Sequence, residues 1–160
     1  MVEYEYSYKV KNILPFLNYC EENGYIKKKE NMQTRVLFTN GRGMLARMTT
    51  TFQDGKEVVD FNLKDEGNLE QTLNLCRESP KLIVSDTNRE FVYSMLDMLE
   101  FKKFKELKRK RYVYVKGNVK FEIDDYINPV MKVLAIEGEK EEVDKAYRVL
   151  SKEIERLKEE

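Results

Sequence analysis

The first nine residues constrain the fold most strongly, because polar residues alternate with aromatic ones from the start of the chain. The odd positions hold Glu3, Glu5, Ser7 and Lys9, and tyrosines hold positions 4, 6 and 8. Successive side chains of a β-strand point to opposite sides of the sheet, so this pattern predicts a strand with one charged face. That face lies either in water, as in many antiparallel sheets, or against a polar cavity.

Length and charge narrow the options for the rest of the chain. At 160 residues, positions 1–160 are expected to form a single domain. Basic and acidic residues both number 29, so no net field points to nucleic acid or a membrane surface, and any anion site must be local. Charged residues reach 36% while 41% of residues are hydrophobic, which excludes a disordered chain. The charges therefore lie on an ion-paired surface or inside a wet cavity.

Histidine is absent from the sequence, and the two cysteines, Cys20 and Cys76, stand far apart. This excludes a zinc cluster and a Cys-His nucleophile, so two buried thiols are expected. Acid-base chemistry near neutral pH would fall to carboxylates, lysine, tyrosine or metal-bound water. With no leader-like segment and no apolar run of membrane-spanning length, we expect a cytoplasmic protein without a membrane partner.

Beyond the first strand, hydrophobic spacing and turn residues predict a meander of antiparallel strands with three helices. The expected strands cover 33–39, 44–53, 57–64, 102–127 with a turn at 116–118, and 130–137, and the expected helices cover 12–24, 87–99 and 140–157. Residues 65–80 fit a helix nearly as well as a strand. Many antiparallel strands with inward-facing charges favour a barrel-like sheet, with the helices packed outside.

Further charged residues recur at alternate positions on these strands. They are Arg47, Lys64, Arg109, Arg111, Glu122, Asp124 and Glu137. Taken singly, each fits a solvated strand face with cross-strand ion pairs, and the basic run at 108–111 also fits an RNA-binding patch. Taken together, acids near both ends of the chain and bases in its middle favour a shared polar interior.

Several motifs, in order, resemble the CYTH domain family, also called triphosphate tunnel metalloenzymes. They are the basic strand at 108–114, Phe-Glu-Ile-Asp at 121–124, Ala-Ile-Glu-Gly-Glu at 135–139 before the last helix, and Gln-Thr-Arg-Val-Leu-Phe at 33–38. The family includes class IV adenylate cyclases, thiamine triphosphatases and inorganic triphosphatases. The resemblance implies an α+β fold, an antiparallel eight-stranded tunnel-like β-barrel with flanking helices, that binds a triphosphate-containing molecule or polyphosphate with Mg²⁺ or Mn²⁺.

The resemblance also implies roles for individual residues. The metal ligands would be Glu3, Glu5, Asp124 and Glu137. The residues that contact phosphate would be Arg47, Lys64, Arg109 and Arg111. The catalytic residues would be Glu3, Glu5 and Lys9. Hard cations prefer oxygen ligands, and a polyphosphate needs several cations to offset its charge. Metal-bound water would attack the terminal phosphorus, so that no histidine is needed.

Four departures from the family pattern bear on catalysis. Ser7 occupies the position where the signature has lysine, and Lys9 is the nearest replacement. Ala135 occupies the position of a glutamate, and Arg35 the position of an acid. The strand that contains Arg47 keeps one of the family's two arginines. The sequence thus leaves open a metal-dependent phosphohydrolase, an adenylate cyclase and a non-catalytic module for a phosphate ligand or, less favoured, RNA. A structural β-protein with a charged surface is a further alternative. The oligomeric state is also open, with a homodimer as one option.

Overall fold

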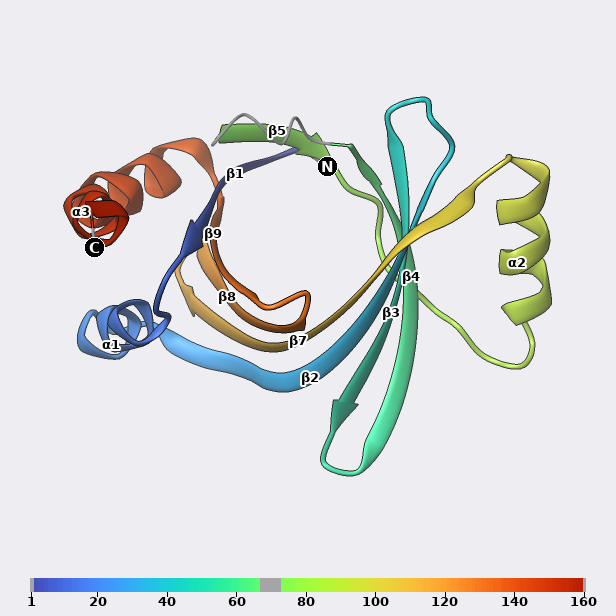
Figure 1. Cartoon of the computed structure of the whole chain (residues 1–160), viewed down its shortest axis with the longest axis horizontal. Coiled ribbons are helices and arrows are strands. Elements are labelled where there is room, and N and C mark those ends of the chain that lie inside the picture. Colours follow the sequence, from blue (N-terminus) through green and yellow to red (C-terminus); the bar gives the residue numbers. More distant parts are fainter. Residues whose placement is uncertain (1, 67–72, 160) are drawn as a thin grey trace.

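A computed structural model describes residues 2–66 and 73–159 of the chain, as one curved antiparallel sheet with three helices. Strand order across the sheet is β5-β1-β9-β8-β7-β2-β3-β4-β6 (Figure 1). The strands are β1 (Val2–Val10), β2 (Ile26–Thr39), β3 (Met44–Gln53), β4 (Lys56–Asp65), β5 (Leu73–Arg77), β6 (Leu82–Ile83), β7 (Lys102–Lys116), β8 (Val119–Asn128) and β9 (Met131–Gly138). The helices are α1 (Leu14–Glu22), α2 (Arg89–Met98) and α3 (Lys140–Glu159).

The sheet has the expected tunnel-like form. In the described chain, eight strands have five or more residues, and the ninth, β6, adds only two at one edge. The ladder is not closed all the way round, but the two ends of the sheet approach each other through an isolated antiparallel bridge between Lys64 and Glu78. The α+β fold class expected from the sequence is therefore confirmed.

The hydrophobic core lies between the sheet and the helices on its outer side, not inside the curve of the sheet. One cluster joins α1 and α3 to the sheet through residues such as Phe16, Phe121, Ile136, Val143 and Leu150. A second cluster joins α2 to β3 and β4 through residues such as Ala46, Phe61, Val92 and Leu96. Because strand side chains alternate, packing the apolar face outward against the helices turns the polar face inward. Figure 1 shows the helices outside the curved sheet.

Most elements agree with the sequence expectations to within a few residues. The strand expected at 33–39 is longer, because β2 begins at Ile26. Of the ambiguous segment 65–80, the part at 73–77 is a strand, and 67–72 lies outside the described residues. Cys20 is buried as expected, and the side chain of Cys76 is not among those described. No helix in the described chain is both long and apolar enough to cross a membrane.

Candidate functional site

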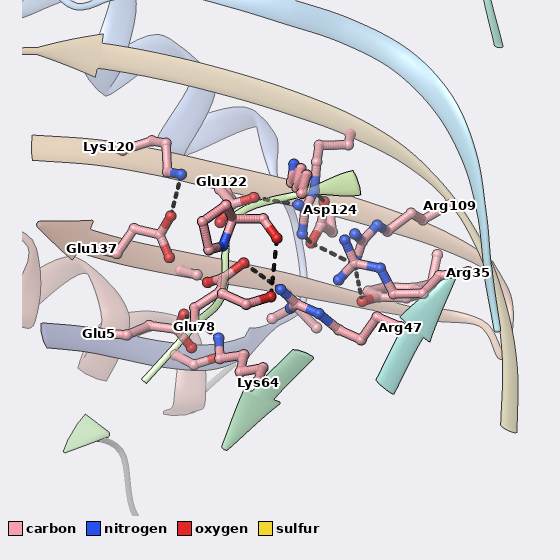
Figure 2. Close-up of a pocket in the computed structure, with 18 residues that line it drawn as sticks. Glu5, Arg35, Arg47, Lys64, Glu78, Arg109, Lys120, Glu122, Asp124 and Glu137 are labelled. Atoms are coloured by element: carbon pink, nitrogen blue, oxygen red, sulfur yellow. Dashed lines mark hydrogen bonds and ion pairs between the residues drawn. The ribbon is translucent and has the colours of Figure 1, made fainter. Parts of the chain in front are cut away.

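The inner face of the sheet encloses a cavity of about 370 Å³ whose wall is mainly charged (Figure 2). The bases that line it are Arg35, Arg47, Lys64, Lys81, Arg109, Arg111 and Lys120, and the acids are Glu5, Glu78, Glu122, Asp124 and Glu137. Among the described lining residues, seven bases thus face five acids. The charged strand faces line this interior, which argues against the alternative that they form an ordinary solvated surface. A cavity with surplus positive charge suits an anionic ligand.

Strand register explains how residues far apart in sequence meet here. Arg111 on β7 lies directly opposite Asp124 on β8, and Glu5 on β1 lies directly opposite Glu137 on β9. Residues two apart on a strand share a face, so each of these pairs brings its alternate neighbours into the same cavity. The alternation seen in the sequence therefore carries over into the site.

Arg111 and Asp124 form a paired guanidinium and carboxylate. Arg111 donates from Nε and Nη2 to the two carboxylate oxygens of Asp124, each at 2.8 Å, and it also forms an ion pair with Glu122. Burial opposes the charge on Arg111, but Glu122 and Asp124 more than offset this and raise its pKa. Asp124, which the resemblance assigns to metal, thus has both oxygens engaged by a guanidinium.

Arg109 lies deeper, with 2% of its surface exposed. It donates to Gln33 Oε1 at 2.9 and 3.1 Å and to the Tyr126 hydroxyl at 2.8 Å, and its Nη1 lies 3.5 Å from Asp124 Oδ2. Burial and the nearby Arg111 lower the pKa of Arg109. Neutral oxygens therefore supply most of the contacts that fix this guanidinium.

Arg47 and Lys64, to which the family resemblance assigns phosphate contacts, line the cavity from β3 and β4. Arg47 donates to Asn62 Oδ1 at 3.1 Å and forms an ion pair with Glu78, and Lys64 Nζ lies 3.4 Å from Glu5 Oε2. Burial opposes ionisation of Glu78, but Arg47 and Lys64 lower its pKa. Glu78 was not among the predicted site residues, because it lies within the segment 65–80 of ambiguous structure and reaches the cavity next to its bridge with Lys64.

Glu137 and Glu122 form a carboxyl pair beside Lys120. Glu137 is buried and forms an ion pair with Lys120. Burial, the charge of Glu122 and a hydrogen bond between the two carboxyl groups raise the pKa of Glu137 to about 9. For Glu122, burial acts against the charged form, but Arg111 and Lys120 hold the pKa below its ordinary value. The raised pKa of Glu137 beside the lowered pKa of Glu122 favours one proton held between the two carboxyl groups.

A divalent cation would meet only two directly opposed carboxylates among the described residues. No cluster of three or more Asp, Glu, His or Cys suited to a metal occurs among the described side chains, and the side chain of Glu3 is not among them. Glu5 and Glu137 are nonetheless directly opposed. Mg²⁺ is commonly held by one or two carboxylates together with substrate phosphates, so these two residues fit such an ion when a phosphate ligand supplies further oxygens.

Lys9 lies outside the cavity, whereas Arg35 lies inside it. Lys9, proposed as a replacement for the signature lysine, is exposed and is not among the residues that line the cavity. Arg35, which the sequence marks only as a departure from the family pattern, lines the cavity and is buried. Its signal was the alternation of polar residues at 31, 33 and 35, all three of which are buried on the inner side of β2.

Comparisons with known proteins bear on the fold. No protein-family model matches the chain, and no curated protein matches it in sequence. Among solved structures, a conserved hypothetical protein from Pyrococcus furiosus superposes with a TM-score of 0.70 at 22% identity, covering 93% of this chain and 90% of that one. A candidate adenylate cyclase from Vibrio parahaemolyticus gives 0.62 at 16% identity, covering 98% and 84%. A second candidate adenylate cyclase, from Bacillus halodurans, gives 0.60 at 13% identity, covering 96% and 91%. These similarities show that the chain has the CYTH-like fold.

Proposed function

We propose that the cavity binds a triphosphate-containing small molecule or polyphosphate, together with Mg²⁺ or Mn²⁺. The observation that carries the proposal is the excess of bases over acids among the described residues that line the cavity. Four of those bases are arginines, whose planar guanidinium groups match phosphate oxygens with two parallel hydrogen bonds. A polyphosphate offers several anionic groups in a row, which suits cations spread over several strands.

Glu5 and Glu137 are the residues that would hold the divalent cation. They face each other on β1 and β9, at one side of the cavity in Figure 2, with Arg109 and Arg35 at the other. When bound there, the ion would neutralise phosphate oxygens and lower the pKa of a coordinated water. Lys64 lies beside Glu5 and is placed to contact a phosphate group next to that ion.

Two further arginines that line the cavity, Arg111 and Arg47, would orient the phosphate chain. Arg111 is held rigidly by Asp124 and Glu122, and Arg47 is held by Asn62 and Glu78. Because these partners fix the guanidinium groups before a ligand arrives, little reorganisation is needed on binding. A metal-dependent triphosphatase needs this arrangement, and a binding module needs it equally.

Adenylate cyclase activity is the second candidate for the same cavity. Its support is the shared fold with two candidate adenylate cyclases. In that reaction the attacking group is the ribose hydroxyl of the substrate, so ATP would give cyclic AMP and diphosphate in place of released phosphate. No described set of residues is assigned to the base of a nucleotide.

The test is to incubate the purified protein with tripolyphosphate, ATP or thiamine triphosphate in Mg²⁺ or Mn²⁺. Phosphate release, cyclic AMP formation and calorimetric binding are measured in parallel. We expect binding of at least one ligand, with Arg47→Gln weakening it about tenfold or more through loss of a charged hydrogen bond. Arg89→Gln, at an exposed position on α2 outside the cavity, is the matched control and should bind like the wild type. Absence of binding by the wild type with all three ligands would refute the proposal.

A further inference from the structure

Arg35 differs from the other arginines of the cavity in how its charge is balanced. It is 9% exposed and lines the cavity from β2. Its Nε donates to Thr49 Oγ1 at 2.9 Å, and among the described side chains no carboxylate lies within ion-pairing distance. By contrast, Arg47 pairs with Glu78, and Arg109 lies 3.5 Å from Asp124.

The surroundings of Arg35 make this lack of an acid costly to the folded state. Burial lowers the pKa of Arg35 well below its ordinary value, and the positive charges of Arg109 and Arg47 lower it further. Glu122 lies beyond ion-pairing distance, and its negative charge offsets these effects only in part. A buried cation without a matching anion destabilises a protein, because desolvation of the charge is not offset. A site of this kind gains stability when an external anion supplies the missing charge.

We propose that Arg35 forms a subsite that binds one terminal phosphate group of the ligand directly, without a divalent cation. This inference rests on the proposed function and specifies how one end of the ligand is held. Thr49 fixes the Nε edge of the guanidinium, while the two terminal nitrogens make no hydrogen bond to the described residues. Two parallel N–H donors are the arrangement that binds a phosphate with both oxygens engaged.

The subsite lies apart from the carboxylates that would hold metal. In Figure 2, Arg35 and Arg109 are at one side of the cavity, and Glu5 and Glu137 are at the other. In the sheet, β8 and β7 separate β9 from β2. A ligand that spans the cavity would therefore have one end neutralised by protein cations and the other by protein carboxylates acting through a metal ion. This arrangement favours a longer phosphate chain, so tripolyphosphate should bind more tightly than diphosphate.

The experiment measures tripolyphosphate binding by calorimetry in EDTA and then in Mg²⁺, for the wild type and Arg35→Gln. We expect the wild type to bind in EDTA and Arg35→Gln to bind about tenfold more weakly or worse, as for loss of a charged hydrogen-bond pair. Arg35→Lys keeps the positive charge but loses the two parallel N–H donors of the guanidinium group, so its affinity for tripolyphosphate should be intermediate. Arg89→Gln is again the control expected to match the wild type.

Thermal melting without ligand provides a second readout that a purely structural arginine would not give. Removal of an unbalanced buried charge should raise the melting temperature of Arg35→Gln above that of the wild type, while its melting shift with tripolyphosphate should shrink. A structural arginine would show a lower melting temperature and an unchanged ligand shift.

The outcomes separate this inference from the proposed function. If the wild type binds tripolyphosphate only when Mg²⁺ or Mn²⁺ is present, the proposed function stands and the subsite is overturned. Equal affinity of Arg35→Gln and the wild type in EDTA would also overturn the subsite. If the wild type binds no phosphate ligand with or without metal, the proposed function fails and the subsite fails with it.

Discussion

Ser7 on β1 and Ala135 on β9 lie directly opposite each other in the antiparallel register, and both line the cavity. By the resemblance to CYTH proteins, lysine would stand at position 7 and glutamate at position 135. Opposed side chains on one face of a sheet are about 5 Å apart, so the two departures are neighbours in space. A cation and a carboxylate are thus missing together, and the net charge of the cavity is unchanged by their joint loss.

The first prediction concerns restoring this pair. Ser7→Lys combined with Ala135→Glu should raise phosphate release from tripolyphosphate in Mg²⁺ or Mn²⁺, because a third carboxylate would join Glu5 and Glu137 and a phosphate contact would return. Each single variant should gain less and should melt at a lower temperature, since it adds one unpaired charge, at the half-buried position 7 or at the buried position 135. Phosphate release by the double variant no faster than by the wild type would contradict this view of the two residues.

A second prediction separates a structural role from a metal role at Asp124. Arg111→Gln should lower the free energy of unfolding by about 3 to 5 kcal/mol, because Asp124 and Glu122 lose their guanidinium partner. Asp124→Asn should also destabilise the protein, and the double variant should lose less than the sum of the singles. Urea unfolding in EDTA measures all three. Arg77→Gln, which removes an ion pair to Asp65 from an exposed arginine, is the control and should change stability little.

Additive losses at Arg111 and Asp124 would show that the two bonds of 2.8 Å do not couple in solution. Unchanged stability of Asp124→Asn, with weaker Mg²⁺ binding, would instead favour the metal role that the family resemblance assigns to this residue.

The sequence predicts those parts of the structure that local patterns determine. The alternation in residues 2–10 and the turns at Gly41 and Gly55 lead directly to β1 and to the β2-β3 and β3-β4 hairpins, because side-chain period and turn chemistry are encoded within a few residues. Glu78 could not be predicted in the same way. It joins the site through a bridge to Lys64, and that contact depends on how the whole sheet curves.

The sequence also could not predict which charged side chains pair with each other. The alternation placed Arg109 and Arg111 on one face, but it could not show that Arg111 is neutralised by Asp124 and Glu122 while Arg35 has no described acid partner. Those differences arise from register across three or four strands. Register depends on the cumulative pairing of the sheet, including the irregularities in β2 and β7.

The third prediction follows from the raised pKa of Glu137 in the folded protein. In the unfolded chain the pKa of this carboxyl group is close to the ordinary value for glutamate. Between about pH 5 and pH 9 the folded protein holds a proton on this pair that the unfolded chain has released, so this group makes stability fall as the pH rises through that window. Glu137→Gln cannot release a proton and should lose this dependence. Melting curves in EDTA should show the variant gaining stability relative to the wild type from pH 5.5 to pH 8.5.

The lowered pKa of Glu122 makes the stability of the folded protein change with pH in the opposite direction. Its lowered pKa contributes stability that is present above the ordinary carboxyl pKa and is lost as the pH falls through the folded value. Glu122→Gln should therefore lose its difference from the wild type only in acid. Parallel curves for the wild type and Glu137→Gln between pH 5.5 and pH 8.5 would contradict the shared proton.

The last prediction tests how the end of β9 is positioned next to Glu137. Gly138 has a φ of +143°, and a Cβ there would lie 1.9 Å from the carbonyl oxygen and 3.1 Å from the carbonyl carbon of Asn118. Backbone atoms yield little, so Gly138→Ala should cost about 3 kcal/mol or more, from backbone strain and overlap together. Gly43→Ala is the matched control, because its φ of +82° is strained but its Cβ would meet no atom within 4 Å, and it should cost only about 1 kcal/mol. Urea unfolding compares the two, and equal losses would show that contact with Asn118 does not constrain β9. Because Gly138 directly follows Glu137, Gly138→Ala should also weaken Mg²⁺-dependent binding, whereas Gly43→Ala should not.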